Sequence, residues 1–169
     1  MRALRGFEPV HSPEARVLIL GSLPGPESLR QRQYYAQPRN AFWRIMGNLY
    51  GAGWDLPYEE RLARLRERRV ALWDVCRSAR RRGALDQHIE PGSVRINDFA
   101  GLYTRCPLIE AVFFNGQTAA RLYRTHVVPT LGEASRALPQ AVLPSSSPAY
   151  ASVGYEAKLE AWSAVARHG

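Results

Sequence analysis

Two asparagines of this 169-residue sequence carry side chains suited to recognising or activating a polar ligand. Asn40 ends the corner Pro38-Arg39-Asn40, and Asn115 ends the apolar run IEAVFFN ahead of Gly116. An amide side chain both donates and accepts hydrogen bonds, so Asn115 is suited to read a lactam edge and Asn40 to hold a water molecule. Each has a structural alternative, because asparagine also caps helices and loops.

Two further segments combine turn-forming residues with hydrogen-bonding groups. They are Gly21-Ser22-Leu23-Pro24-Gly25 and Ser145-Ser146-Ser147-Pro148. The first can aim backbone N–H groups at a ligand, and the hydroxyls of the second can donate to phosphate oxygens. The first lacks the G-K-[ST] and G-x-G-x-x-G signatures of nucleotide-binding loops. A plain turn is the structural alternative for both segments.

Aromatic side chains surround the corner at Asn40. Tyr34 and Tyr35 precede it, and an aromatic ring can stack on a nucleobase. Phe42 and Trp43 follow it in a helical pattern of apolar residues, so we expect these two rings in the core rather than in the site.

The chain is strongly basic, with 23 Lys and Arg against 15 Asp and Glu, a net charge of +8 and a pI of about 10.1. Such a charge favours a polyanionic partner such as DNA or RNA. A solvated basic surface with an arginine bias is the alternative, since Lys158 is the only lysine. The candidates for phosphate contact follow predicted strand ends or lie in the corner motif: Arg39, Arg77, Arg80, Arg81 and Arg82.

The sequence gives no sign of a metal or cofactor site. Its two cysteines, Cys76 and Cys106, are too few for a four-thiolate cluster or zinc site, and its four histidines are scattered. No apolar run approaches the roughly 18 residues that span a bilayer, and the N-terminus does not resemble a secretory signal. We therefore expect a cytoplasmic monomer with no metal, cofactor or membrane partner.

The elements that would position these residues alternate along the chain. Four apolar runs typical of buried parallel strands lie at residues 16–22, 70–75, 109–115 and 141–145. Helical patterns lie at residues 40–50, 58–69, 97–105, 117–126 and 156–167. This alternation predicts a single α/β domain over residues 1–169, with three α/β/α layers around a mainly parallel sheet of about four strands. Ligands of such sheets bind beyond the carboxyl ends of the strands, where the polar segments fall.

Taken together, the motifs G-S-x-P-G and Q-Y-Y-A-x-P-R-N-x-F-W resemble the hypoxanthine-DNA glycosylase branch of the uracil-DNA glycosylase superfamily, and the resemblance runs over residues 17–155. It implies a base pocket shaped by residues 21–25, a stacking role for Tyr35 and a catalytic role for Asn40. Many relatives carry a catalytic Asp or Asn where this chain has Leu23, which cannot polarise water.

The second motif of that superfamily corresponds to residues 143–148, which the resemblance places in the minor groove against the DNA backbone. Many relatives carry a bulky apolar wedge there, whereas Ser147 is small, so that Pro148 or Tyr150 would have to replace it. The cysteine-ligated cluster of some relatives cannot form with two cysteines.

The resemblance implies a monofunctional DNA glycosylase that flips a deaminated base out of DNA and hydrolyses its N-glycosidic bond, with hypoxanthine the favoured base and uracil second. Asn40 can orient water but cannot deprotonate it, so the bond must break largely before water attacks. Asn115 would accept both bases, because they present the same acceptor–donor pair. The alternatives are a uracil or G:T/G:U mismatch glycosylase of this fold and a catalytically silent nucleic-acid-binding domain.

A glycosylase that also cuts the strand needs an amine nucleophile in its site. Lys158 falls in the helical pattern 156–167, outside the apolar stripe of Leu159, Trp162 and Val165. The sequence therefore predicts that Lys158 has no neighbours in the site and that the enzyme leaves the strand uncut.

Overall fold

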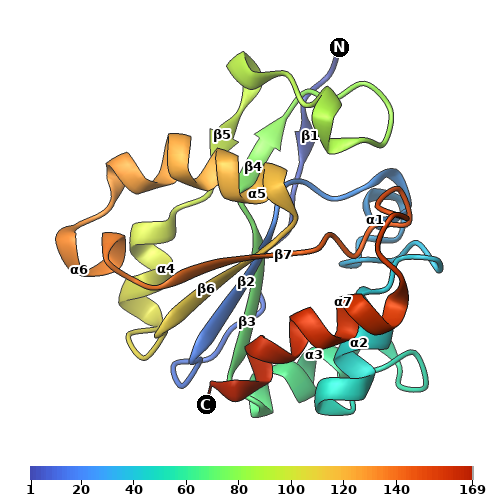
Figure 1. Ribbon diagram of the computed structural model, residues 1–169. Coiled ribbons are helices and arrows are strands. Elements are labelled where there is room, and N and C mark those ends of the chain that lie inside the picture. The colour runs from blue at the N-terminus through green and yellow to red at the C-terminus, as the bar shows by residue number, and fades with distance from the viewer. Residues whose placement is uncertain (169) are drawn as a thin grey trace.

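The central sheet of the computed structural model, which describes residues 1–168, has four parallel strands. They are β2 (Val17–Gly21), β3 (Val70–Asp74), β6 (Ala111–Asn115) and β7 (Gln140–Leu143), in the spatial order β3-β2-β6-β7 (Figure 1). Every residue of β2, β3 and β6 is buried. The four predicted strands are confirmed, because continuous apolar runs suit strands that are covered on both faces.

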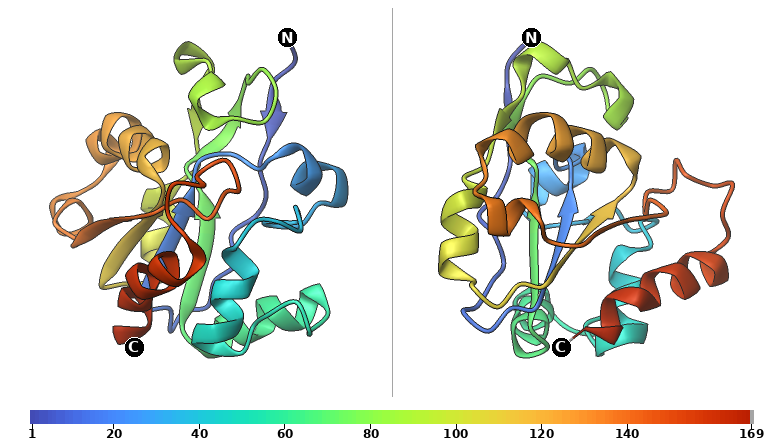
Figure 2. Two further views of the ribbon diagram at one scale, coloured as in Figure 1. Left: turned by 45° about the vertical axis from the view of Figure 1, so that its right-hand side comes forward. Right: turned by 60° about the vertical axis from the view of Figure 1, so that its left-hand side comes forward.

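Helices cover both faces of this sheet (Figures 1 and 2). One layer holds α2 (Phe42–Tyr50), α3 (Tyr58–Glu67) and α7 (Tyr155–Trp162), and the other holds α4 (Phe99–Arg105), α5 (Gln117–Leu122) and α6 (Glu133–Arg136). Alternate residues of β2 serve the two layers. Leu18 and Leu20 join the core under α4 and α5, whereas Val17 and Ile19 join the core under α2 and α7. The predicted three-layer α/β/α fold is confirmed.

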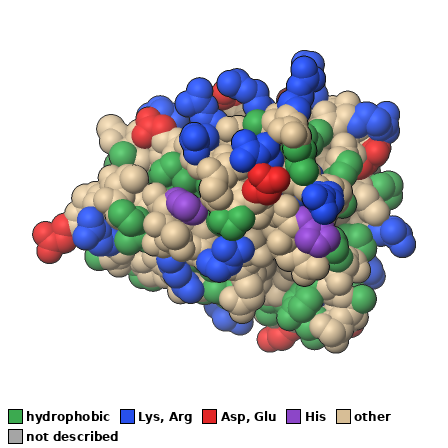
Figure 3. Space-filling view, turned by 90° about the horizontal axis from the view of Figure 1, so that it is seen from above, with side chains coloured by type: hydrophobic (Ala, Val, Ile, Leu, Met, Phe, Trp, Pro, Cys, Tyr) green, Lys and Arg blue, Asp and Glu red, His purple; other side chains and the backbone are tan. Residues whose placement is uncertain are grey.

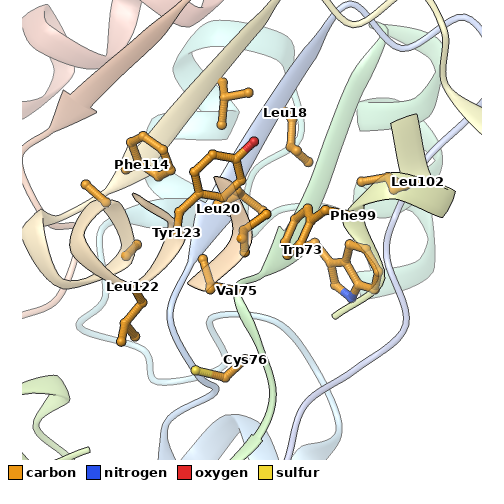
Figure 4. Close-up of a cluster of buried hydrophobic side chains, with 14 of the residues drawn as sticks. Leu18, Leu20, Trp73, Val75, Cys76, Phe99, Leu102, Phe114, Leu122 and Tyr123 are labelled. Carbon is orange, nitrogen blue, oxygen red and sulfur yellow. The ribbon is translucent and has the colours of Figure 1, made fainter. Parts of the chain in front are cut away.

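Each core combines side chains from distant parts of the chain. On the α4 and α5 side, Phe114 of β6 packs against Tyr123 with ring centroids 5.1 Å apart (Figure 4). On the other side, Phe42 and Trp43 are completely buried, as the sequence predicted. The two cores fix the strands from both sides and so fix the positions of the residues at their carboxyl ends.

A second, smaller sheet was not predicted. It pairs β1 (Leu4–Arg5), β4 (Cys76–Ala79) and β5 (Arg95–Ile96) in antiparallel fashion. Strands of two to four residues are too short for a periodic pattern to reveal them. The remaining elements are α1 (Pro26–Gln31), the helical turns Asp86–His88, Pro91–Ser93, Val128–Thr130 and Ser163–Arg167, and the π-helical turn Tyr123–Val127. Within residues 1–168, no helix is long and apolar enough to cross a membrane.

The order of the strands reverses at β2. The chain passes from β2 to β3 on one side and then returns to place β6 and β7 on the other side. Parallel α/β sheets bind ligands at such a switch point, outside the carboxyl ends of the central strands. Gly21 and Asn115 end those strands, so the topology brings two predicted site residues to the expected place.

Candidate active site

A cavity of about 930 Å³ opens at the carboxyl edge of the sheet. Its wall comes from segments 21–28, 34–40, 84–87, 115–118 and 142–150, together with Asp74. All four polar segments singled out in the sequence therefore contribute to one cavity, although the first, residues 21–25, and the last, residues 145–148, lie far apart in the chain.

Asn40 precedes Ala41, the N-cap of α2, and is also part of the cavity wall. Its Oδ1 accepts a hydrogen bond of 2.9 Å from the backbone N–H of Phe42, where α2 begins. This bond uses one lone pair of the amide oxygen and fixes the orientation of the side chain. The second lone pair and the NH₂ group are what Asn40 can offer to water or substrate, so the two interpretations of this residue are compatible.

The ring of Tyr35 is held against α2. It stacks on Phe42 with ring centroids 4.1 Å apart and an interplanar angle of 24°, and its backbone adopts a left-handed φ of 52°. Residues other than glycine rarely adopt such a φ, so the surrounding structure must impose this backbone conformation on Tyr35. The half-buried ring lines the cavity, which is the position that the stacking hypothesis requires.

Asn115 holds the serine segment in place. Its Nδ2 donates to Ser146 Oγ at 2.8 Å, and its Oδ1 accepts from the Ser146 backbone N–H at 2.9 Å. The Ser146 carbonyl in turn accepts from the N–H of Ala41 at 3.0 Å. Asn115 thus links the serine segment to the corner that carries Asn40, and Ser146 leaves one N–H and one lone pair of its amide unused.

The three serines differ in their exposure. Ser146 is 1 % exposed, and its hydroxyl serves Asn115. Ser145 and Ser147 are partly exposed, and their hydroxyls accept hydrogen bonds from the backbone N–H groups of Ser147 and Ala149, at 3.1 Å and 3.2 Å. A hydroxyl that accepts from the backbone keeps its own hydrogen for donation, so Ser145 and Ser147 are the serines suited to phosphate contact. Pro148 lines the same cavity.

Comparison with known proteins identifies the family. The family model described as the uracil DNA glycosylase superfamily matches residues 8–166. The chain belongs to the uracil DNA glycosylase superfamily. Two curated relatives are named hypoxanthine DNA glycosylase. The protein from Methanosarcina acetivorans is 40% identical over 78% of this chain and 88% of its own length, and the protein from Methanosarcina barkeri is 40% identical over 67% and 71%.

A solved structure agrees with this assignment to the superfamily. A solution NMR structure of a Methanosarcina acetivorans protein described as a uracil DNA glycosylase superposes on this chain with a TM-score of 0.81 and is 38% identical in sequence. The match covers 98% of both chains. The fold that places the cavity of this chain is therefore the fold of its superfamily.

The first superfamily motif is a close-packed floor of the cavity. Leu23 is buried in the core, and the Ser22 hydroxyl donates to Asp86. A side chain at Gly21 would place its Cβ 2.5 Å from Asp74 Oδ1 and 2.8 Å from the Tyr35 hydroxyl. Only glycine fits at position 21, because such distances are far inside van der Waals contact.

Two acidic residues of the site were missed in the sequence. Asp74 is the last residue of β3, and Asp86 opens a helical turn over the cavity. Burial, and then the neighbouring Asp86 carboxylate, raise the pKa of Asp74 to about 7, and Arg81 opposes the shift. Burial also raises the pKa of Asp86. The available signal was a lone carboxylate at the end of the apolar run VALWD.

Two of the predicted phosphate contacts have other partners. Arg81 is buried and donates through Nη2 to the Pro24 carbonyl at 3.0 Å, so it supports the floor of the cavity and cannot reach phosphate. Arg80 pairs with Glu90 at 2.8 Å. Arg39 is exposed and lines the cavity, as its predicted role requires.

The predicted position of Lys158 is wrong. Its side chain is 5 % exposed, its Nζ donates to the Ser147 carbonyl at 3.4 Å, and burial lowers its pKa. Lys158 lines a second cavity, of about 440 Å³, whose wall includes Asn40 and Arg39. The helix begins at Tyr155 and is rotated so that Lys158 points at the serine segment, which an apolar stripe alone could not reveal.

The described residues 1–168 contain no group of three His, Cys, Asp or Glu side chains placed to bind a metal ion. Cys76 and Cys106 are both buried free thiols that form no disulfide.

Proposed function

We propose that this chain is a monofunctional DNA glycosylase that hydrolyses the N-glycosidic bond of deaminated bases, with hypoxanthine the preferred base and uracil the second. The observation that carries the proposal is the convergence of Asn40, Tyr35 and Asn115 on one cavity at the switch point of the sheet. The names of the two 40% identical relatives support hypoxanthine.

The cavity suits a base that has been flipped out of the duplex. Phe42 supports Tyr35 from behind, so a base stacked on the free face of Tyr35 would meet a ring that is already fixed. Asn115 would offer its remaining N–H to the exocyclic oxygen of the base and its remaining lone pair to the ring N–H. Hypoxanthine and uracil share that edge, whereas adenine and cytosine reverse it.

Asn40 would orient the attacking water. An amide oxygen accepts a hydrogen bond but takes no proton at neutral pH, so water would attack a sugar that already carries most of its positive charge. The bond between C1′ and the base nitrogen breaks, and the base leaves as an anion. The water oxygen bonds to C1′ and gives up a proton to solvent, and the base anion takes up a proton from solvent. Catalysis would then rest on positioning and on stabilising the departing base.

The grip on DNA would come from arginines and from the serine segment. Basic side chains are spread over the face seen from above, with few acidic side chains between them (Figure 3). The hydroxyls of Ser145 and Ser147 would add neutral hydrogen bonds to phosphate oxygens. We expect action as a monomer, and the DNA substrate would place the enzyme in the cytosol or nucleoid.

The test is single-turnover cleavage of labelled duplexes that carry one inosine, one deoxyuridine or one mismatched thymine. We expect release of hypoxanthine, slower release of uracil, and strand breaks only after alkali. Release of uracil or thymine without hypoxanthine would favour the mismatch alternative. Tight binding without release of any base would favour a silent binding domain.

A further inference from the structure

Asp74 stands in the wall of the base cavity, and the proposed mechanism leaves it without a role. Its side chain is 4 % exposed, and its Oδ2 has no hydrogen-bond partner among residues 1–168. A buried polar atom without a partner destabilises the fold, so such atoms in native proteins call for an explanation. A ligand that completes the hydrogen bonding is one explanation.

A second polar atom shares this position. The buried Tyr35 hydroxyl makes no hydrogen bond of ordinary geometry within the described residues, although the Asn115 side chain lies close enough to oppose the rise of its pKa. This hydroxyl and Asp74 Oδ1 both lie beside Gly21. A side chain at position 21 would collide with both oxygens, so the glycine is what allows Asp74 and Tyr35 to lie together in this part of the cavity wall. The two groups come from different elements, β3 and the segment before α2, and meet at the switch point of the sheet.

Burial, and then the charge of Asp86, favour the neutral form of Asp74. Asp86 faces it from the turn after Leu85, and the phenols of Tyr34 and Tyr35 and the thiol of Cys76 are its other titratable neighbours. Arg81 is the cation nearby, but its guanidinium is bonded to the carbonyls of Pro24 and Gly83. With a pKa of about 7, Asp74 is mostly protonated below pH 7 and mostly ionised above it.

We propose that Asp74 acts as a neutral acid that donates a hydrogen bond to the exocyclic oxygen of the flipped base. The inference rests on the proposed function and adds a catalytic group to it. Negative charge develops on the base as the C1′–N bond breaks, and part of it resides on this oxygen. A fixed donor in a buried site stabilises that charge more than it stabilises the uncharged base in the ground state. The proton stays on Asp74 throughout.

The ionised form cannot replace the neutral form in this role. A carboxylate only accepts hydrogen bonds, so it would repel the exocyclic oxygen of hypoxanthine or uracil and the charge that grows there. The rate of base release should therefore be at its maximum below the pKa of Asp74 and should fall as the pH rises through that pKa. A carboxylate that activated water as a general base would give the opposite slope.

The experiment is the pH dependence of single-turnover hypoxanthine release between pH 5.5 and 9.5, with enzyme in excess over an inosine duplex. We expect a plateau at acidic pH and then about a tenfold loss for each pH unit above the pKa of Asp74. Asp74→Asn keeps an N–H donor that does not titrate. It should retain the rate of the unmodified enzyme within about tenfold at pH 6 and should lose the alkaline decline.

Three further variants separate this role from a structural one. Asp74→Ala should lower the rate at pH 6 by about 10²-fold, as loss of an oxyanion donor does. Asp86→Asn should keep an alkaline decline but move it to lower pH, because the Asp86 carboxylate helps to raise the pKa of Asp74. Asp98→Asn, which changes the exposed cap of α4, is the matched control and should keep both rate and profile.

The outcomes separate the inference from the proposed function. No base release by the unmodified enzyme at any pH would overturn both. Release with a flat or rising profile would overturn the inference alone. So would an alkaline decline that persists in Asp74→Asn and disappears in Asp86→Asn. Thermal melting of each variant verifies folding, and the profile of the unmodified enzyme tests the inference even if a variant fails to fold.

Discussion

Two cavities meet at Asn40, and they differ in charge. Both walls include Arg39. The wall of the larger, inner cavity adds the carboxyl groups of Glu27, Asp74 and Asp86. The wall of the smaller, outer cavity adds the cations Arg44 and Lys158 and no carboxyl group. A neutral base suits the first cavity and a phosphate group suits the second, so the corner at Asn40 would separate the part of the nucleotide that leaves from the part that stays.

The comparison also clarifies the net charge of +8. A basic chain attracts DNA as a whole, but basic residues alone would draw phosphates into every opening. The inner cavity offers a phosphate no cation beyond the shared Arg39, whereas an uncharged base can enter it without leaving a charge unpaired. Affinity and chemistry would then reside in different places, and mutations on the two sides of Asn40 should affect different measurements.

The largest expected effect is at the corner itself. Asn40→Ala should lower single-turnover hypoxanthine release by about 10²-fold or more, because one preorganised group that positions water is lost. The affinity for an inosine duplex should change little, since Asn40 carries no charge. Single-turnover kinetics and fluorescence anisotropy measure the two quantities. A variant with a normal rate and weakened binding would assign Asn40 to the outer cavity instead.

A smaller effect is expected on the wall of the inner cavity. Asn115→Ala removes the two hydrogen bonds to Ser146 together with the proposed contact to the base edge. Each lost bond to a buried group costs about 1–3 kcal/mol. Hypoxanthine and uracil release should therefore fall together, by about tenfold or more. Loss of release for only one of the two bases would show that Asn115 does not read their shared edge.

The regular elements could be predicted because a strand buried on both faces requires a continuous run of apolar residues, and one polar residue at its end does not hide such a run. The same physics explains why Asp74 was missed, since a carboxylate at the end of VALWD looks like the end of a strand until burial is known. Lys158 shows the opposite error. Its sequence context resembles a solvated helix face, and only the path of the loop after Ser147 brings that face to the site.

On the outer side, effects should be limited to affinity. Arg44→Ala removes an exposed cation that lies 3.6 Å from the ring centroid of Tyr155 and lines the outer cavity. We expect DNA binding to weaken several-fold and the slope of log K against log salt to fall by about one. The release rate at saturating enzyme should not change.

Arg105→Ala is the control for this experiment, because Arg105 is also exposed but ends α4, ahead of the amino end of β6 in the chain. It should leave both affinity and salt slope unaltered. Equal losses in the two variants would mean that the cations act through overall charge, and the distinction between the cavities would not hold for binding.

The smallest effect is expected for Lys158, where we predict that borohydride traps no covalent adduct between the protein and DNA. Lys158 is the only lysine, and it lies close enough to the site that strand cleavage through a Schiff base deserves a direct test. Its amine, however, donates to the Ser147 carbonyl, and its side chain lines the outer cavity. Lys158 is not among the described residues that line the inner cavity. The sugar carbon that an amine must attack would lie on the inner side of Asn40.

Borohydride should therefore trap no protein–DNA adduct on an inosine duplex, and Lys158→Arg should release hypoxanthine at the normal rate. Arginine keeps the cation for phosphate but forms no Schiff base under these conditions. An adduct that disappears in Lys158→Arg would place the amine on the inner side and overturn the division between the cavities. An adduct that persists in that variant would point to the N-terminal amine, which is the other candidate nucleophile.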